Sequence, residues 1–194
     1  MFSGRFCRGL KAMKLRFDEA KATQIAALIL KLRGGRMHYL KLIKLLYLVD
    51  RAALLNWGVP VTTDHYVSMD NGPVVSRIYN LITEETPKPW WAEFISAPLG
   101  EYEVELRKDA PTDRLSRAEE KLIHDVYDQY GRMNRWALVD YVHTLPEWQN
   151  PHGGMIPISI RDILKGGGED DQEIRAVMRE LRAMATAEEQ LSPV

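Results

Sequence analysis

Histidine and cysteine, the side chains that most often hold a metal ion, are sparse in this 194-residue chain. No two of the five histidines have metal-ligand spacing, and the sequence His-Glu-x-x-His does not occur. The single cysteine, Cys7, can form neither an intramolecular disulfide nor a cysteine-based zinc site, which is typical of a reducing cytoplasm. We therefore expect a cytoplasmic protein that uses no metal and no cofactor.

Hydrolytic chemistry also has few candidates. The nucleophile-elbow sequence Gly-x-Ser-x-Gly is absent. A Ser-His-Asp triad is defined by geometry and not by chain order, so the sequence leaves it open. Asp50 with His65 or His143 would be the best candidate for a small hydrolase, although a histidine such as His143, near a helix end, more often caps carbonyls or packs on an aromatic ring. Because no catalytic spacing is present, we expect no enzyme.

Asp50 is the most informative single residue. It lies on an apolar helical stripe with Leu46 and Leu54, and a carboxylate that faces a core is costly unless it is paired or hydrogen-bonded. Either it is a binding or catalytic carboxylate with a perturbed pKa, or it anchors its helix to an arginine or to backbone N–H groups of the following segment. We favour the anchor, with Arg77 or the turn 70–72 as partner.

The stretch "VSMDNGPVVSRIYNLI", residues 67–82, contains Gly72 followed by Pro73. A phosphate-binding loop would need more glycines and the lysine of a Walker sequence, which is absent. Gly72 permits a tight turn, and Pro73 suits the first position of a helix, where its missing N–H is not needed. We therefore expect a structural joint between a strand and a helix.

Around this joint, the first part of the chain has two predicted helices, two predicted strands and one predicted loop. One helix begins at Asp18 and ends at Gly34-Gly35, and a longer, largely buried helix covers 37–58. Strands are predicted within 59–72 and 101–108, and these two could pair as an antiparallel sheet. The prolines of 86–100 predict an extended loop.

The second half is helical again. Ser116, Asn134 and Ser159 are predicted helix caps, and Gly166 to Gly168 are a predicted flexible break before an acidic final helix. The fold class is therefore mainly α: a single helical domain with a small antiparallel β element inserted after the central helix. The predicted divisions are a basic tail (1–17), a domain (18–165) and an acidic helical extension (166–194).

The charge of the chain is asymmetric, although its net value is only -1. Residues 1–44 hold eleven Lys or Arg and two acids, whereas residues 166–194 hold seven acids and three Arg. Such a basic end could meet nucleic acid, but no nucleic-acid reading motif accompanies it, so we expect the charged faces of amphipathic helices instead. No apolar run approaches the roughly 18 residues of a membrane span, so no membrane partner is expected. Met13 is a candidate alternative start.

Two blocks of the sequence together resemble the Panacea domain family, also called SocA-like antitoxins. The first is "LKLIKLLYLVDRAALLNWGVPVTTDHYVSMDNGPVVSRIYNLI" and the second is "HTLPEW". The resemblance covers about residues 18–165, and it rests on Lys41, Leu45, Tyr47, Asp50, Gly58, Pro60, Tyr66, Gly72, Pro73, Val74, His143, Pro146 and Trp148.

The resemblance implies an antitoxin of a bacterial or phage toxin–antitoxin pair. Family members bind and neutralise a separately encoded toxin, and at least one branch is linked to delivery of the toxin to an ATP-dependent protease. The family provides no catalytic residues to transfer. A DNA-binding regulator that uses the basic N-terminal region remains the alternative, and the identity of the toxin stays open.

Candidate contacts with a toxin lie on two segments. The wetter face of the helix 37–58 carries Lys41, Lys44 and Arg51, with Asp70 at the neighbouring turn. Trp90-Trp91 lies in the proline-rich loop, and exposed tryptophan and arginine commonly dominate interfaces. The alternative for Trp90-Trp91, which we weigh equally, is that one or both cover the core.

Overall fold

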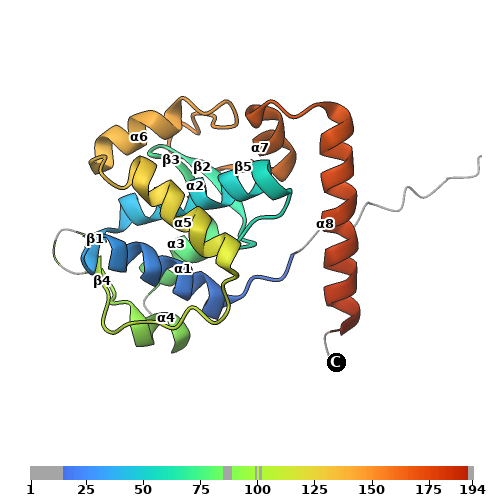
Figure 1. Ribbon diagram of the computed structural model, residues 1–194. Helices are drawn as coiled ribbons and strands as arrows, with labels where there is room; N and C mark the ends of the chain where they lie inside the picture. Colours follow the sequence, from blue (N-terminus) through green and yellow to red (C-terminus); the bar gives the residue numbers. More distant parts are fainter. Residues whose placement is uncertain (1–14, 85–88, 99, 101, 192–194) are drawn as a thin grey trace, which may run out of the picture.

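The computed structural model describes residues 15–84, 89–98, 100 and 102–191, and it is mainly helical with two small antiparallel sheets, as the sequence predicts (Figure 1). The helices are α1 (Glu19–Leu32), α2 (Tyr39–Trp57), α3 (Ser76–Thr83), α4 (Pro89–Phe94), α5 (Arg117–Tyr130), α6 (Arg135–His143), α7 (Ile160–Gly167) and α8 (Asp171–Leu191). The strands are β1 (Arg36–His38), β2 (Tyr66–Met69), β3 (Gly72–Val75), β4 (Glu103–Glu105) and β5 (Ile156–Ile158).

Helix α2 forms the centre of the core. Its apolar residues recur on nearly every face, so it is packed by α1, α5, α6, α7 and β3 (Figure 1). The helix ends where Gly58 adopts a left-handed conformation that favours glycine. Leu48, which lies beside the predicted wetter face of Lys41, Lys44 and Arg51, is also buried, at 4% exposure, because neighbours surround the helix more completely than its sequence indicates.

Helices α1, α5, α6 and α7 begin where the sequence predicts. Asp18, Ser116, Asn134 and Ser159 each accept a hydrogen bond from a backbone N–H of the first turn. The prediction of a flexible break at Gly166 to Gly168 was wrong, because α7 extends through Gly167. A side chain at Gly167 would collide with Leu55 of α2, so glycine there permits close helix packing.

The predicted pairing of the two strands was wrong. β4 pairs with β1, whereas β2 pairs with β3 on one side and β5 on the other. The cause is the two-residue loop Asp70-Asn71, since the chain turns back at once and β2 finds its partner in the next segment. Strands β1, β3 and β5 had not been expected from the sequence.

Two proline-based predictions also need correction. Pro73 does not start a helix: it lies in β3 opposite Ser68, and α3 begins at Ser76. β3 is an edge strand, where a residue without an N–H is tolerated. The loop expected to be extended contains α4, and Pro89 occupies its first helical position.

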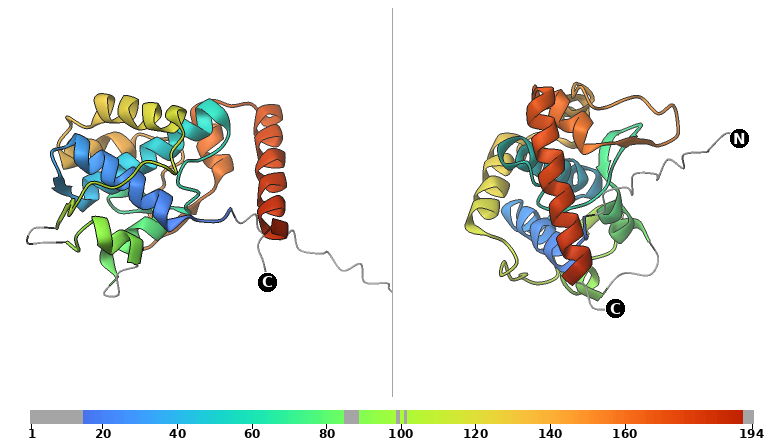
Figure 2. Two further views of the ribbon diagram at one scale, coloured as in Figure 1. Left: turned by 60° about the horizontal axis from the view of Figure 1, so that its bottom comes forward. Right: turned by 90° about the vertical axis from the view of Figure 1, so that its right-hand side faces the viewer.

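Helix α8 lies along one side of the body (Figures 1 and 2). Ile174 and Leu181 are buried, and the Glu188 carboxylate accepts a hydrogen bond from the Arg16 N–H at 3.0 Å. The boundaries 1–17, 18–165 and 166–194 stay predictions. Among the described residues, no helix has the length and apolar character that crossing a membrane requires.

Gly72 is expected to tolerate no side chain. Its φ of +96° favours glycine, and a Cβ there would lie 2.6 Å from Val142 Cγ2. Gly35 is a matched control, because its φ is +90° but a Cβ would meet nothing within 4 Å. Gly35→Ala should therefore cost only backbone strain, about 1–2 kcal/mol. Gly72→Ala should cost about 1–3 kcal/mol more through overpacking.

Equilibrium urea unfolding of both variants measures this difference. Equal losses of unfolding free energy would contradict the packing argument at Gly72.

Candidate functional site

Helix α2 carries a row of polar residues at three-residue steps, Lys41, Lys44, Tyr47 and Asp50, followed by Arg51. We call these five residues the polar row. Each three-residue step turns the side chain by roughly 60° relative to the previous one, because an α-helix has about 3.6 residues per turn. The polar row therefore fans around the helix, and its members reach different segments of the chain.

Asp50 is completely buried and binds the segment between α2 and β2. Its Oδ1 accepts hydrogen bonds from the backbone N–H of Val61 at 2.9 Å and of Thr62 at 2.8 Å. Its Oδ2 accepts from the hydroxyls of Thr62 and of Tyr66, the latter at 2.9 Å. Burial raises the pKa of Asp50 to about 6, and these hydrogen bonds oppose that rise.

Asp50 therefore binds backbone N–H groups of the following segment, as the anchor interpretation predicts. The prediction of which residues would be its partners was wrong. Arg77 and the turn 70–72 form none of the hydrogen bonds that Asp50 accepts. The hydrogen bonds described for Asp50 come from Val61, Thr62 and Tyr66, and His143 stacks on Trp148.

Asp64, and not Asp50, is the carboxylate that accepts a hydrogen bond from Arg77. Its carboxylate accepts from the N–H groups of Arg77 and Ile78, both at 2.9 Å, and thereby holds the first turn of α3. Desolvation raises the pKa of Asp64 against these bonds. Sequence reasoning missed this residue because it lies far before the helix it stabilises, outside the usual capping spacing.

Lys41 and Lys44 do not lie on a wet face, which corrects the prediction that they contact a partner from an exposed position. They are 6% and 0% exposed. Lys41 Nζ donates to the Gly131 carbonyl at 2.6 Å, where α5 ends, and Lys44 Nζ donates to the Pro73 carbonyl at 2.7 Å. Burial lowers the pKa of both amines, that of Lys44 to about 7.

Tyr47 and Arg51 share one acceptor. The Tyr47 hydroxyl and Arg51 Nε both donate to Glu147 Oε1 at 2.8 Å, and the Glu147 side chain is fully buried. Burial and the nearby Glu147 carboxylate raise the pKa of Tyr47 well above its usual value, so its hydroxyl remains a donor. Arg51 was expected at the surface, but only 17% of its side chain is exposed. The sequence analysis did not identify Glu147 as a site residue. Its position between Pro146 and Trp148, both of which were identified, was the available indication.

The remaining residues of the two sequence blocks shape the same interior. His143 stacks on Trp148 with ring centroids 4.0 Å apart, and Trp148 Nε1 donates to the Met69 carbonyl at 3.1 Å. Most of the other predicted site residues are buried, namely Leu45, Gly58, Pro60, Tyr66, Gly72, Pro73 and Val74, whereas Pro146 is exposed. These contacts hold the β2–β3 hairpin against the segment after α6.

The two neighbouring tryptophans have different positions. Trp91 is buried at 1% exposure, whereas Trp90 is 41% exposed and stacks on Phe94. Arg114 lies over the Trp90 ring, 6.0 Å from its centroid. Beside them is a hollow of about 630 Å³, between the start of α1, α4 and the end of α8.

Asp70 is exposed at the hairpin tip, as expected, and accepts from the Gly153 N–H at 2.9 Å.

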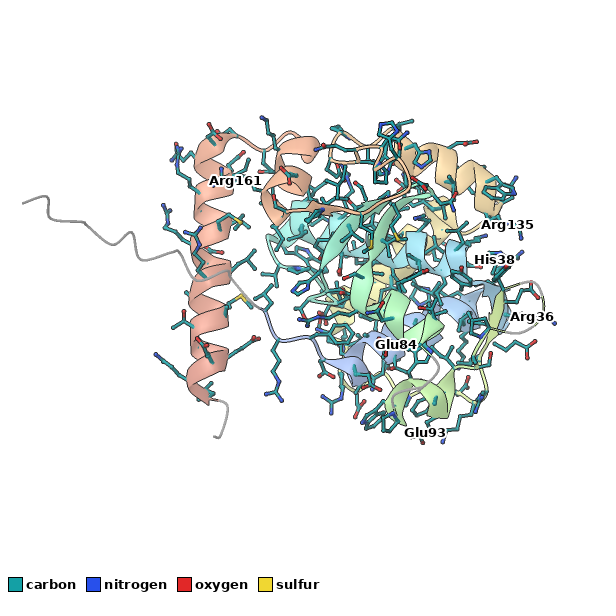
Figure 3. All side chains as sticks on the ribbon, turned by 180° about the vertical axis from the view of Figure 1, so that it is seen from behind. Arg36, His38, Glu84, Glu93, Arg135 and Arg161 are labelled. Atoms are coloured by element: carbon teal, nitrogen blue, oxygen red, sulfur yellow. The ribbon has the colours of Figure 1, made fainter. Side chains whose placement is uncertain are left out.

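The six side chains labelled in Figure 3 do not converge on one place. Figure 3 shows Arg36, His38 and Arg135 along one edge, Glu84 and Glu93 toward another, and Arg161 near α8. Within the described ranges, no group of three or more His, Cys, Asp or Glu side chains could hold a metal ion.

The chain matches a known protein family. The model of the family described as "Antitoxin SocA-like, Panacea domain" matches residues 42–149, which is more than half of the chain. A search of curated proteins and a search of solved structures found no match. The matched range contains most of the polar row together with Glu147.

Removal of the Asp50 carboxylate should destabilise the fold. Asp50→Ala leaves the N–H groups of Val61 and Thr62 buried and unpaired, so it should cost about 1–3 kcal/mol. Thr62→Val is the comparison variant, because it keeps the two backbone N–H donors to Asp50. It removes the hydroxyl that donates to the carboxylate and accepts from the Asp64 N–H at 3.2 Å, and it should cost about 1 kcal/mol. Thermal unfolding of both variants provides the measurement. If Asp50→Ala unfolds like the parent, the anchor interpretation is wrong.

Lys44 should make stability depend on pH. Its pKa falls from 10.5 in the unfolded chain to about 7 in the fold, so between these values the unfolded chain binds more protons. Stability contributed by this residue should therefore rise with pH across that window, by up to roughly 1.4 kcal/mol per pH unit.

Lys44→Met, which keeps the apolar stem and removes the amine, isolates this contribution. The difference in unfolding free energy between parent and variant should grow in favour of the parent between pH 7 and 10.5. A constant difference across this range would show that the amine is not desolvated.

Proposed function

Since the chain belongs to the SocA-like antitoxin family through its Panacea domain, we propose that it neutralises a cognate protein toxin by direct contact. The family match over residues 42–149 carries this proposal. The polar row is compatible with a binding protein, because each of its members forms a hydrogen bond within the fold and so has a structural role. Recognition of a partner then depends on residues outside the polar row.

The surface around Trp90 is the contact we favour. Tryptophan and arginine are enriched where binding energy concentrates, and Trp90 with Arg114 presents both at one place. The adjoining hollow of about 630 Å³ gives this surface a concave shape into which a partner side chain fits. Arg16 and Glu188 at its edge can supply polar contacts.

Delivery of the toxin to an ATP-dependent protease is a finer version of the same proposal. Direct contact is required by both routes, so the Trp90 surface serves sequestration and delivery alike. The two routes differ in outcome: sequestration leaves the toxin intact in a stable complex, whereas delivery lowers its amount.

The DNA-binding alternative is not favoured by the described part of the basic region. Lys21, Lys31 and Arg36 form ion pairs with Glu119, Asp109 and Glu103, respectively. Lys41 and Lys44 are buried. These cations are therefore poorly placed to replace the counterions of a phosphate backbone.

Co-expression with the product of the adjacent gene tests the proposed function. The two proteins should co-purify, and the chain should relieve growth inhibition caused by its neighbour. Persistent toxicity in cells that contain both folded proteins would contradict the proposal. The amount of the neighbour protein, compared in cells with and without the protease, separates sequestration from delivery.

Trp90→Ala tests the contact surface. Trp90 is 41% exposed, so its loss should change the melting temperature little and reduce toxin affinity by about 2 kcal/mol or more, as for a hot-spot residue. Trp136→Ala is the matched control, because Trp136 is 54% exposed but lies on α6, away from α4 (Figure 1). Binding can be measured by calorimetry with the purified neighbour protein. Equal binding by parent and Trp90→Ala would place the contact elsewhere.

A further inference from the structure

A pocket of about 430 Å³ lies between the end of α3, helix α4 and the first residue of α2. Its described lining is mostly apolar and includes Leu81 and Ile82 of α3. Pockets that bind small molecules commonly measure roughly 300–1,000 Å³ and combine apolar walls with a few polar groups. The volume of this pocket is near the lower end of that range, so it is suited to a small ligand.

Two side chains of opposite charge line this pocket, and both are exposed to solvent. Glu84 lies just after α3 (Figure 3), and Arg107 follows β4. Within the described ranges, neither residue takes part in an ion pair, and the two do not pair with each other. The described lining contains no other Asp, Glu, Lys, Arg or His. The pocket therefore offers one anionic and one cationic group that a ligand can reach.

Two tyrosines form an aromatic corner at the same pocket. The rings of Tyr39 and Tyr102 lie 5.9 Å apart and 72° from parallel, and the Tyr39 N–H donates to the Tyr102 carbonyl at 2.9 Å. Tyr102 is 61% exposed and has a φ of +68°, a conformation that bulky residues rarely adopt. The backbone thus holds an exposed ring at the pocket, and the face of such a ring attracts an ammonium group.

Tyr39 adds no charge to this corner. Burial and the neighbouring Tyr79 and Tyr102 raise the pKa of Tyr39, so its hydroxyl stays protonated near neutral pH.

We infer that this pocket binds a free α-amino acid with an apolar side chain. The ammonium group of the ligand pairs with Glu84, its carboxylate pairs with Arg107, and its side chain packs on the apolar walls. Arginine binds carboxylates through strong, charge-assisted hydrogen bonds that are often bidentate. An α-amino acid carries both of its charges on one carbon, so it can bridge an acid and a base that do not bond to each other.

The inference is independent of the proposed antitoxin function. The pocket shares no described lining residue with the hollow beside Trp90. Trp91 lines the pocket, whereas Trp90 lines the hollow, and consecutive residues of a helix point about 100° apart. The two sites therefore meet different faces of α4, and ligand binding can be measured on the purified chain without a toxin.

Isothermal titration calorimetry of the full chain tests this inference with L-leucine, L-methionine, L-phenylalanine and L-tryptophan. At least one of them should bind saturably, whereas glycine, which lacks an apolar side chain, should not. For the amino acid that binds best, the N-acetyl derivative removes the ammonium charge and the amide derivative removes the carboxylate. Each derivative should bind about tenfold or more weakly, the equivalent of one charge-assisted hydrogen bond.

Two outcomes of this titration overturn the inference. One is the absence of binding by all four amino acids. The other is a derivative that binds as tightly as its parent amino acid, because the missing charge then has no partner in the pocket. Tight binding of the N-acetyl derivative, which resembles the carboxyl end of a peptide, would indicate a chain terminus and not a free amino acid.

Two variants assign the charges of the ligand to residues of the pocket. Arg107→Gln should weaken binding of the amino acid about tenfold but leave binding of the amide unchanged, because the amide has no carboxylate. Glu84→Gln should weaken the amino acid similarly and leave the N-acetyl derivative unchanged. Arg132→Gln and Glu180→Gln are the matched controls and should bind like the parent, because both residues are exposed and do not line the pocket. Equal weakening of the amino acid and the derivative by either pocket variant contradicts the site.

Discussion

The fold depends on the burial of charged and polar side chains along α2. Ionisable groups in a core are costly unless each finds a partner of suitable geometry. Here the partners come from different, distant segments: the end of α5, β3, the loop before β2, and the segment after α6. Because the polar row fans around one helix, satisfying all of its members at once permits essentially one arrangement of these segments.

This arrangement explains how short elements remain ordered. β2 and β3 have four residues each and α3 has eight, so none would be stable in isolation. Asp50 holds the entry to the hairpin, Lys44 holds β3, and Asp64 holds the first turn of α3. Hydrogen bonds to buried carboxylates and from a buried amine thus replace the extensive apolar burial that longer elements would provide.

The sequence predicted the local features and missed the long-range ones. Helix caps such as Ser116 and Asn134 depend on residues within one turn, so their spacing identified them. The pairing of β4 with β1 depends on residues 36–38 and 103–105, and nothing in either segment specifies the other. The charges of Lys41 and Lys44 suggested solvent exposure, because periodicity cannot reveal an acceptor carbonyl that folding brings near. Asp50 was the informative exception, since its apolar surroundings along the helix marked it as buried.

The separation between interior and surface has a consequence for recognition. A substitution in the polar row changes the position of several segments together, so it affects any binding surface indirectly through the fold. A substitution at Trp90 changes mainly the surface, because its side chain is 41% exposed and its ring packs on Phe94. A protein built in this way can acquire a different partner by changing exposed residues while the buried hydrogen bonds stay the same. In this fold, stability therefore depends on the buried contacts of α2, whereas the exposed residues are free to differ without changing those contacts.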